Sequence, residues 1–144
     1  MSVLILDASV AAKWVLPPGG ETLLDQALQL LHGYESGEFQ FVVPDLFWAE
    51  FGNVMWKAVR QGRLSESAAL IAVETMQSRN FPTMPSRDLM ADALRIAVLS
   101  GRTFYDSVYV SLALEANGLF LTADERLANA LGAHLPVRWL GTFA

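Results

Sequence analysis

The sequence predicts a single α/β domain with a mainly parallel sheet over residues 1–144. Short apolar runs alternate with longer helical patterns along the chain, and no repeat or low-complexity linker interrupts them. The chain has 144 residues, of which 53% are hydrophobic and 17% charged, so it is long and apolar enough to bury a sizeable core. In such sheets the active crevice lies beyond the carboxyl ends of the strands.

Strands are expected where short apolar runs are bounded by turn residues. Val3–Leu6 is continuously apolar, as expected for a strand buried on both faces, and Pro44 closes the second run. The expected strands are Val3–Leu6, Phe39–Val43, a brief extended piece Phe81–Met84, Leu119–Leu121 and Val137–Leu140.

Helices are expected where apolar residues recur at helical spacing. Pro17 stops the first, Gly62 separates two others, Ser86 caps the next, and Gly101 ends it. Phe104–Ala116 is apolar almost all round, which predicts a buried helix. The expected helices are Ala8–Val15, Glu21–Tyr34, Leu46–Gln61, Ser65–Arg79, the segment from Ser86 to Gly101, Phe104–Ala116 and Asp124–Leu131.

The composition limits which metal sites are possible. There is no cysteine, which excludes disulfides and thiolate ligands, and the only histidines are His32 and His134. A bound metal would therefore sit among oxygen atoms, the ligands that magnesium and manganese prefer.

The N-terminal segment Met1–Leu16 has the apolar character of a secretion signal, but it lacks a basic start and is interrupted by Asp7 and Lys13. No apolar stretch is long enough to span a bilayer. We therefore expect a cytoplasmic protein. The formal charge of -5 argues against broad attraction to nucleic acid, unless clustered acids hold cations.

Two acidic residues follow predicted strands. Asp7 comes directly after the first strand, and Asp124 follows the strand Leu119–Leu121 by a few residues, so both belong at the same edge of the sheet. An alternative interpretation is that each caps the helix that follows it, as Thr122 could also do. Position alone leaves both interpretations open.

Two further acids lie on helices. Glu50 interrupts an apolar stripe formed with Phe47 and Phe51, and a carboxylate that faces a core needs a cation or hydrogen-bond donors. Asp106 lies near the start of the almost wholly apolar helix, where Thr103 and Asp106 also fit a capping box.

The four acids together can hold one or two divalent cations, which would orient a phosphate and lower the pKa of an attacking water. Neighbouring polar side chains could support the carboxylates, and basic side chains nearby could contact phosphates, with Lys13 favoured among the latter. The supporting candidates are Ser9, Asn53 and Thr122, and the candidates for phosphate contact are Lys13, Arg102 and Arg126.

Four ordered segments resemble the PIN-domain family, and more closely its VapC-type toxins. They are Leu4–Val10 (LILDASV), Pro44–Leu46 continuing through Glu50 and Asn53, Tyr105–Ala113 (YDSVYVSLA) and Leu121–Leu127 (LTADERL). The resemblance runs over nearly the whole chain in the right order.

This resemblance implies a three-layer α/β/α fold and a Mg²⁺- or Mn²⁺-dependent endoribonuclease. It places Asp7, Glu50, Asp106 and Asp124 in the metal site. It also implies a homodimer and a cognate antitoxin that occupies the active-site groove.

Three alternatives remain from the residues themselves. A DNA or flap-type nuclease would share the metal site, because nothing in the chain visibly reads a 2′-hydroxyl. A non-catalytic binding module would use the acids as helix caps. An aspartate-nucleophile phosphatase would need a second Asp two residues after Asp7, where the chain has Ser9.

Overall fold

A computed structural model describes residues 2–143. Its sheet has five strands in the order β3-β2-β1-β4-β5, and every neighbouring pair is parallel. The strands are β1 (Ser2–Leu6), β2 (Phe39–Pro44), β3 (Thr83–Met84), β4 (Leu119–Thr122) and β5 (Val137–Trp139). The prediction of a mainly parallel sheet is confirmed.

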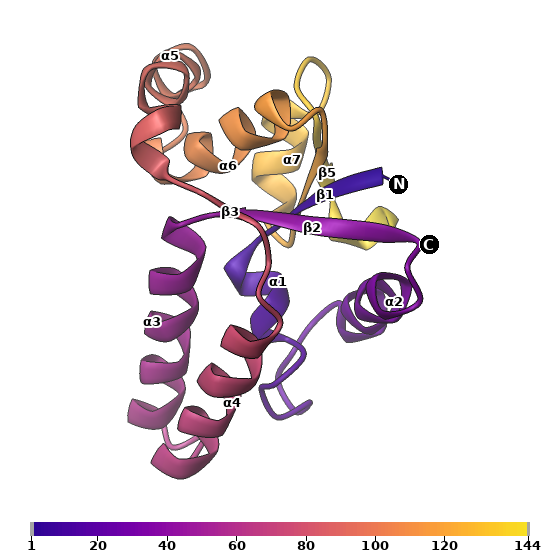
Figure 1. The fold of residues 1–144 in the computed structure, drawn as a ribbon, viewed down its shortest axis with the longest axis vertical. Coiled ribbons are helices and arrows are strands. Elements are labelled where there is room, and N and C mark those ends of the chain that lie inside the picture. Colours follow the sequence, from indigo (N-terminus) through magenta and orange to yellow (C-terminus); the bar gives the residue numbers. More distant parts are fainter. Residues whose placement is uncertain (1, 144) are drawn as a thin grey trace.

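Helices cover both faces of this sheet. In Figure 1, α5, α6 and α7 lie on one side of the strands and α1 to α4 on the other, which gives three layers. The helices are α1 (Ala8–Ala12), α2 (Leu24–Glu35), α3 (Leu46–Arg60), α4 (Glu66–Ser78), α5 (Met90–Ser100), α6 (Phe104–Glu115) and α7 (Glu125–Leu131), with short 3-10 helices at Ser86–Leu89 and Leu140–Thr142.

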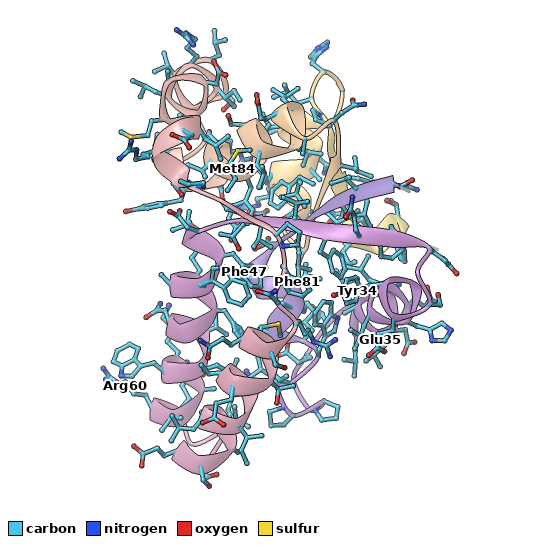
Figure 2. All side chains as sticks on the ribbon, viewed as in Figure 1. Tyr34, Glu35, Phe47, Arg60, Phe81 and Met84 are labelled. Atoms are coloured by element: carbon cyan, nitrogen blue, oxygen red, sulfur yellow. The ribbon has the colours of Figure 1, made fainter. Side chains whose placement is uncertain are left out.

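The core forms where the apolar runs meet. Phe41 on β2 and Phe120 on β4, the two strands that flank β1, are almost completely buried. Helix α6 is buried from Ser107 to Ala113, as its composition predicts. Figure 2 shows Phe47 and Phe81 beside the sheet, where their ring centroids lie 6.0 Å apart. The core therefore extends from the sheet into the space between α3 and α4.

The end of α1 and the start of α2 differ from the prediction. The first helix was expected to reach Val15 but ends at Ala12, because the chain continues in turns with i→i+3 hydrogen bonds before Pro17. The second was expected from Glu21 but begins at Leu24, because Glu21 is held by side chains from elsewhere in the fold.

The segment after β3 also differs from the prediction. Ser86 was expected to cap a continuous helix, but it opens a 3-10 helix, and α5 starts only at Met90. The Ser86 backbone amide and hydroxyl both donate to Asp45 at the end of β2. The predicted end of α5 at Gly101 is confirmed, with φ of 72° at this residue.

Gly118 marks the close approach of the α6–β4 connection to β1. A Cβ atom at this position would lie 2.8 Å from the Val3 carbonyl oxygen. We expect Gly118→Ala to lower the free energy of unfolding by about 1 to 3 kcal/mol, because backbone must move to make room. Gly52→Ala is the control: in the middle of α3 its Cβ would meet nothing within 4 Å, so helix propensity should raise stability by up to about 1 kcal/mol. Urea unfolding of both variants measures the difference.

Candidate metal-binding active site

Asp7 stands where β1 gives way to α1, and its two carboxylate oxygens have different partners. Oδ1 accepts the backbone amide of Ser9 at 3.2 Å, so Asp7 caps α1. Oδ2 accepts the Thr122 hydroxyl at 3.2 Å. Because Leu6 pairs in register with Leu121, the parallel strands deliver Asp7 and Thr122 to the same edge. The predicted meeting of these two strand ends is therefore present.

Thr122 connects Asp7 with Asp124. Its hydroxyl is buried, donates to Asp7 and accepts the backbone amide of Asp124 at 3.1 Å. Asp124 itself caps α7, since its Oδ1 accepts the Leu127 amide at 3.1 Å. Both strand-end acids thus cap helices and also lie at the sheet edge, so the two interpretations of their positions do not exclude each other.

Glu50 enters this edge from the first half of α3, and its partner lies on α6. Its Oε1 accepts the Tyr109 hydroxyl at 2.6 Å. Glu50 is partly buried, which agrees with its place in an apolar stripe. Tyr109 was not singled out from the sequence; a hydroxyl-bearing ring in an otherwise apolar buried helix, three residues after Asp106, was the available signal.

Asp106 lies in the first turn of α6, whose N-cap is Thr103. Thr103 Oγ1 accepts the Asp106 amide at 3.1 Å, which is one half of the predicted capping box. Within residues 2–143 no hydrogen bond returns from the Asp106 carboxylate to the Thr103 amide. The second half of the predicted capping box is therefore missing among these residues.

Electrostatics links the four acids in a chain. Burial, with a contribution from the charge of Glu50, raises the pKa of Asp7 to about 6, although the bonds from Ser9 and Thr122 oppose the shift. Burial and the charge of Asp106 raise the pKa of Glu50. Burial, with a contribution from the charge of Asp124, raises the pKa of Asp106, although a hydrogen bond with the Thr103 side chain and the charge of Arg102 oppose the shift. Each acid therefore acts on the next, and Arg102 offsets part of the negative charge of this edge at Asp106.

These acids fit a divalent cation by chemistry, as oxygen donors that repel one another without a counter-charge. In the part of the chain that the structure describes, no three of the acidic or histidine side chains are arranged as a ready-made metal cage. The acids instead lie as successive neighbours along one edge. The structure thus supports a shared acidic edge, without a preformed metal pocket among residues 2–143.

The other predicted site residues lie in different surroundings. Ser9 and Asn53 are exposed, Ser9 beside Asp7 and Asn53 one turn after Glu50. Arg102 donates to the Arg126 carbonyl at 2.9 Å, and its charge acts on Asp106.

Lys13, ranked first among the three candidates for phosphate contact, is buried. Its Nζ donates to the Thr22 carbonyl at 2.7 Å and lies 3.4 Å from Glu21 Oε1. The structure therefore engages Lys13 inside the protein, whereas Arg102 and Arg126 remain at the surface or its margin.

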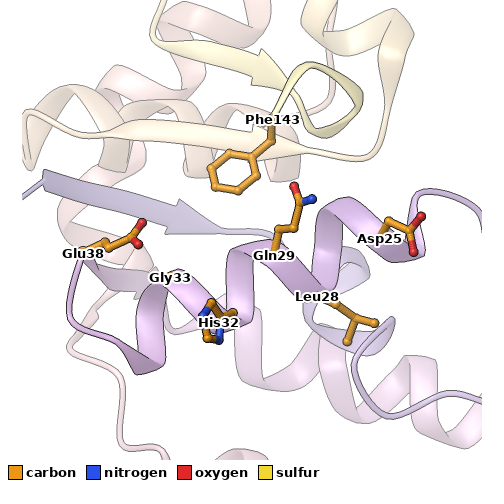
Figure 3. Close-up of a pocket in the computed structure, with 7 residues that line it drawn as sticks. All are labelled: Asp25, Leu28, Gln29, His32, Gly33, Glu38 and Phe143. Atoms are coloured by element: carbon orange, nitrogen blue, oxygen red, sulfur yellow. The ribbon is translucent and has the colours of Figure 1, made fainter.

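The larger hollows lie away from the acidic edge. Figure 3 shows a pocket of about 520 Å³ along α2, and none of the four acids lines it. The lining residues are Asp25, Leu28, Gln29, His32, Gly33, Glu38 and Phe143. A second, more apolar hollow of about 410 Å³ lies between α3 and α4, lined in part by Trp48, Phe51 and Phe81.

Three known proteins match at least nine-tenths of this chain. The chain is 30% identical over 135 residues to Ribonuclease VapC3 of Pyrobaculum aerophilum, covering 90% of this chain and 95% of the relative. The crystal structure of PAE2754 from the same organism superposes with a TM-score of 0.69 at 25% identity, over 99% of this chain and 85% of that one. A toxin–antitoxin complex from Klebsiella pneumoniae has the same fold, with a TM-score of 0.60 at 15% identity over 96% of each chain.

A shorter match and a family profile complete the comparison. Exonuclease VapC9 of Pyrobaculum aerophilum is 38% identical over 86 residues, which are 58% of this chain and 62% of the relative. The profile described as PIN domain matches residues 4–131, which include all four acids of the sheet edge. With most of its length matched by this profile, the chain belongs to the PIN-domain family.

Proposed function

We propose that this protein is a Mg²⁺- or Mn²⁺-dependent endoribonuclease that acts as the toxin of a VapBC-type toxin–antitoxin pair. The observation that supports it most directly is the sheet edge at which Thr122 joins Asp7 to Asp124 by hydrogen bonds. The charges of Glu50 and Asp106 act at the same edge. RNA as the substrate is supported by full-length similarity to a protein named a ribonuclease.

The four carboxylates would hold the cation. When bound, a divalent cation supplies charge that stabilises the phosphate in the transition state and lowers the pKa of the attacking water. Thr122 and the Ser9 amide fix both oxygens of Asp7 in one orientation. Tyr109 occupies Glu50 Oε1, which leaves Oε2 to bind the cation or accept a proton from water.

The basic side chains near this edge are proposed to contact the substrate. Arg102 acts electrostatically on Asp106 and bonds to the backbone of Arg126, so both arginines lie beside the first turns of α6 and α7. Their guanidinium groups would contact RNA phosphates. Lys13 is omitted from this proposal because its ammonium group is engaged by Glu21 and Thr22.

Metal-dependent cleavage is expected on circular as well as linear RNA. The purified protein should cut both with Mg²⁺ or Mn²⁺, and excess chelator should stop cleavage, because the acidic edge needs a cation to bind phosphate. Gel analysis of single-stranded circular RNA, linear RNA and matched DNA gives the readout. Cleavage of linear RNA alone would favour an exonuclease, as the relative VapC9 is named. Cutting that survives chelation would contradict the metal site.

Two protein partners are part of the proposal. An antitoxin that occupies the groove at the acidic edge is supported by the fold shared with a toxin–antitoxin complex. A homodimer is supported by large apolar side chains left exposed on α5, including Leu94, Val98 and Leu99. Co-expression with any small reading frame found beside its gene, followed by light scattering of the free and bound protein, tests both.

The place of action follows from the substrate. Within residues 2–143 no helix is long and apolar enough to cross a membrane. We propose the cytoplasm because the proposed RNA substrate is found there.

A further inference from the structure

We propose that Tyr109 is the positioning residue of the acidic edge: its hydroxyl holds Glu50 in the orientation that binds the divalent cation. The inference rests on the proposed function, since it takes Glu50 to be one of the cation's ligands. Tyr109 itself would touch neither the cation nor the RNA.

The contact between the two side chains is short and joins distant parts of the sequence. The Tyr109 hydroxyl donates to Glu50 Oε1 at 2.6 Å, between residues that are 59 positions apart in the sequence. A hydrogen bond to a charged carboxylate is stronger than one between neutral groups. Among the described residues Glu50 has no basic partner, so this hydroxyl is the donor that fixes its carboxylate.

The ring of Tyr109 is itself fixed. It is 3% exposed and stacks on Phe120, with centroids 5.0 Å apart and planes at 15°. Phe120 lies on β4, two residues before Thr122, the residue that joins Asp7 to Asp124. The Tyr109 ring is therefore held against β4, the strand whose Thr122 also binds Asp7 and Asp124.

Tyr109 also sets the relation between two acids on different helices. It follows Asp106 by three residues on α6, and so shares one helix face with it. Its bond to Glu50 ties that face to α3. The charge of Asp7 also acts on the Tyr109 hydroxyl, which therefore lies near Asp7 as well as Glu50. Through one oxygen of Glu50, Tyr109 would hold the acids of α3 and α6 at a set separation.

A different interpretation is that the phenol merely fills the core and satisfies its hydroxyl with the nearest acceptor. Tyr109→Phe separates the two, because the ring and its stacking on Phe120 remain while the hydrogen bond is lost. Tyr105→Phe is the matched control: it makes the same change on the same helix, at a side chain that is 62% exposed. Glu50→Gln and the Glu50→Gln/Tyr109→Phe double variant complete the set.

The readout is Mn²⁺ binding to each full-length, chelator-treated variant by titration calorimetry, with melting temperature as a check of folding. We expect Tyr109→Phe to weaken Mn²⁺ binding about 10- to 100-fold, as loss of a residue that orients a metal ligand typically does. Tyr105→Phe should bind as the wild type does. In the Glu50→Gln background, Tyr109→Phe should add little further loss, because Tyr109 acts through Glu50.

Each result decides between interpretations. Equal Mn²⁺ affinity of Tyr109→Phe and wild type would overturn the positioning role while leaving the proposed nuclease intact. The same loss with and without Glu50→Gln would also overturn it, because Tyr109 would then act by another route. A wild-type protein that binds no Mn²⁺ at millimolar concentration would instead refute the metal site of the proposed function, and this inference with it.

Discussion

Asp7→Asn is expected to abolish RNA cleavage and at the same time to stabilise the folded protein at neutral pH. The amide oxygen can still accept from the Ser9 backbone, and Asn caps helices as well as Asp does. The negative charge is lost, and with it the oxygen that accepts the Thr122 hydroxyl. We expect cleavage to fall by at least about 100-fold, because even residues that merely orient a metal ligand typically matter 10- to 100-fold. Asp106→Asn should have a similar effect.

The stability change follows from the raised pKa of Asp7. A carboxyl with a pKa of about 6 in the folded state and 3.8 unfolded binds more protons when folded, so the folded state loses stability as pH rises through that interval. At about 1.4 kcal/mol per pKa unit the ceiling is about 3 kcal/mol, and we expect about 1 to 2 kcal/mol because Asp7 keeps some contact with solvent.

The pH and metal dependence test this argument together. Asp7→Asn should unfold at a higher temperature than wild type above about pH 6, and the difference should vanish below about pH 4. Adding Mn²⁺ should stabilise wild type more than the variant, because a bound cation removes the repulsion among the acids. Asp88→Asn, a change at an exposed acid, is the control. A variant that cuts RNA at the wild-type rate would show that the acidic edge is not the catalytic centre.

Alternation of strands and helices was enough to predict the shared edge from the sequence. Parallel strands end on one side, so an acid directly after β1 and another after β4 had to come close, and Thr122 now joins them. Glu50 was predicted for a different reason, as a charge inside an apolar stripe. Local patterns therefore identified each acid, and the topology of the sheet brought them together.

Contacts between distant segments were not predictable in the same way. No sequence pattern pairs Glu50 with Tyr109. Their helices, α3 and α6, lie on opposite sides of the sheet, and the two side chains come together only in the folded protein. Lys13 looked like a surface base beside Asp7. The loop that follows α1 instead folds back and buries it against Glu21, which also delays the start of α2. Propensity decides such ends weakly when a long-range ion pair competes with it.

We expect the largest loss of stability outside the core when the ion pairs of Glu21 with Lys13 and Arg63 are broken. Glu21 accepts Arg63 at 2.8 Å and lies 3.4 Å from Lys13 Nζ, and both Glu21 and Lys13 have side chains about one-tenth exposed. Burial alone would raise the pKa of Glu21. The hydrogen bond from Arg63 and the charge of Lys13 outweigh burial and hold this pKa below its usual value of 4.5.

Glu21→Gln should therefore lower the free energy of unfolding by about 2 to 3 kcal/mol at pH 7, because it leaves the Lys13 charge buried without its counter-charge. Asp92→Asn removes an exposed pair with Arg95 and should cost less than about 0.5 kcal/mol. Urea unfolding at pH 7 compares the two, and equal losses would contradict a buried network.

The pH dependence and a second variant identify the cause of that loss. Because the pKa of Glu21 is depressed in the folded state, its contribution is complete above about pH 4.5 and is lost as pH falls through the lower folded value. The gap between wild type and Glu21→Gln should thus narrow in acid. Lys13→Met in the Glu21→Gln background should recover part of the lost stability, since it removes the stranded charge and keeps an apolar chain of similar length. Recovery would show that Lys13 serves the fold, and RNA cleavage by Lys13→Met at the wild-type rate would separate that role from catalysis.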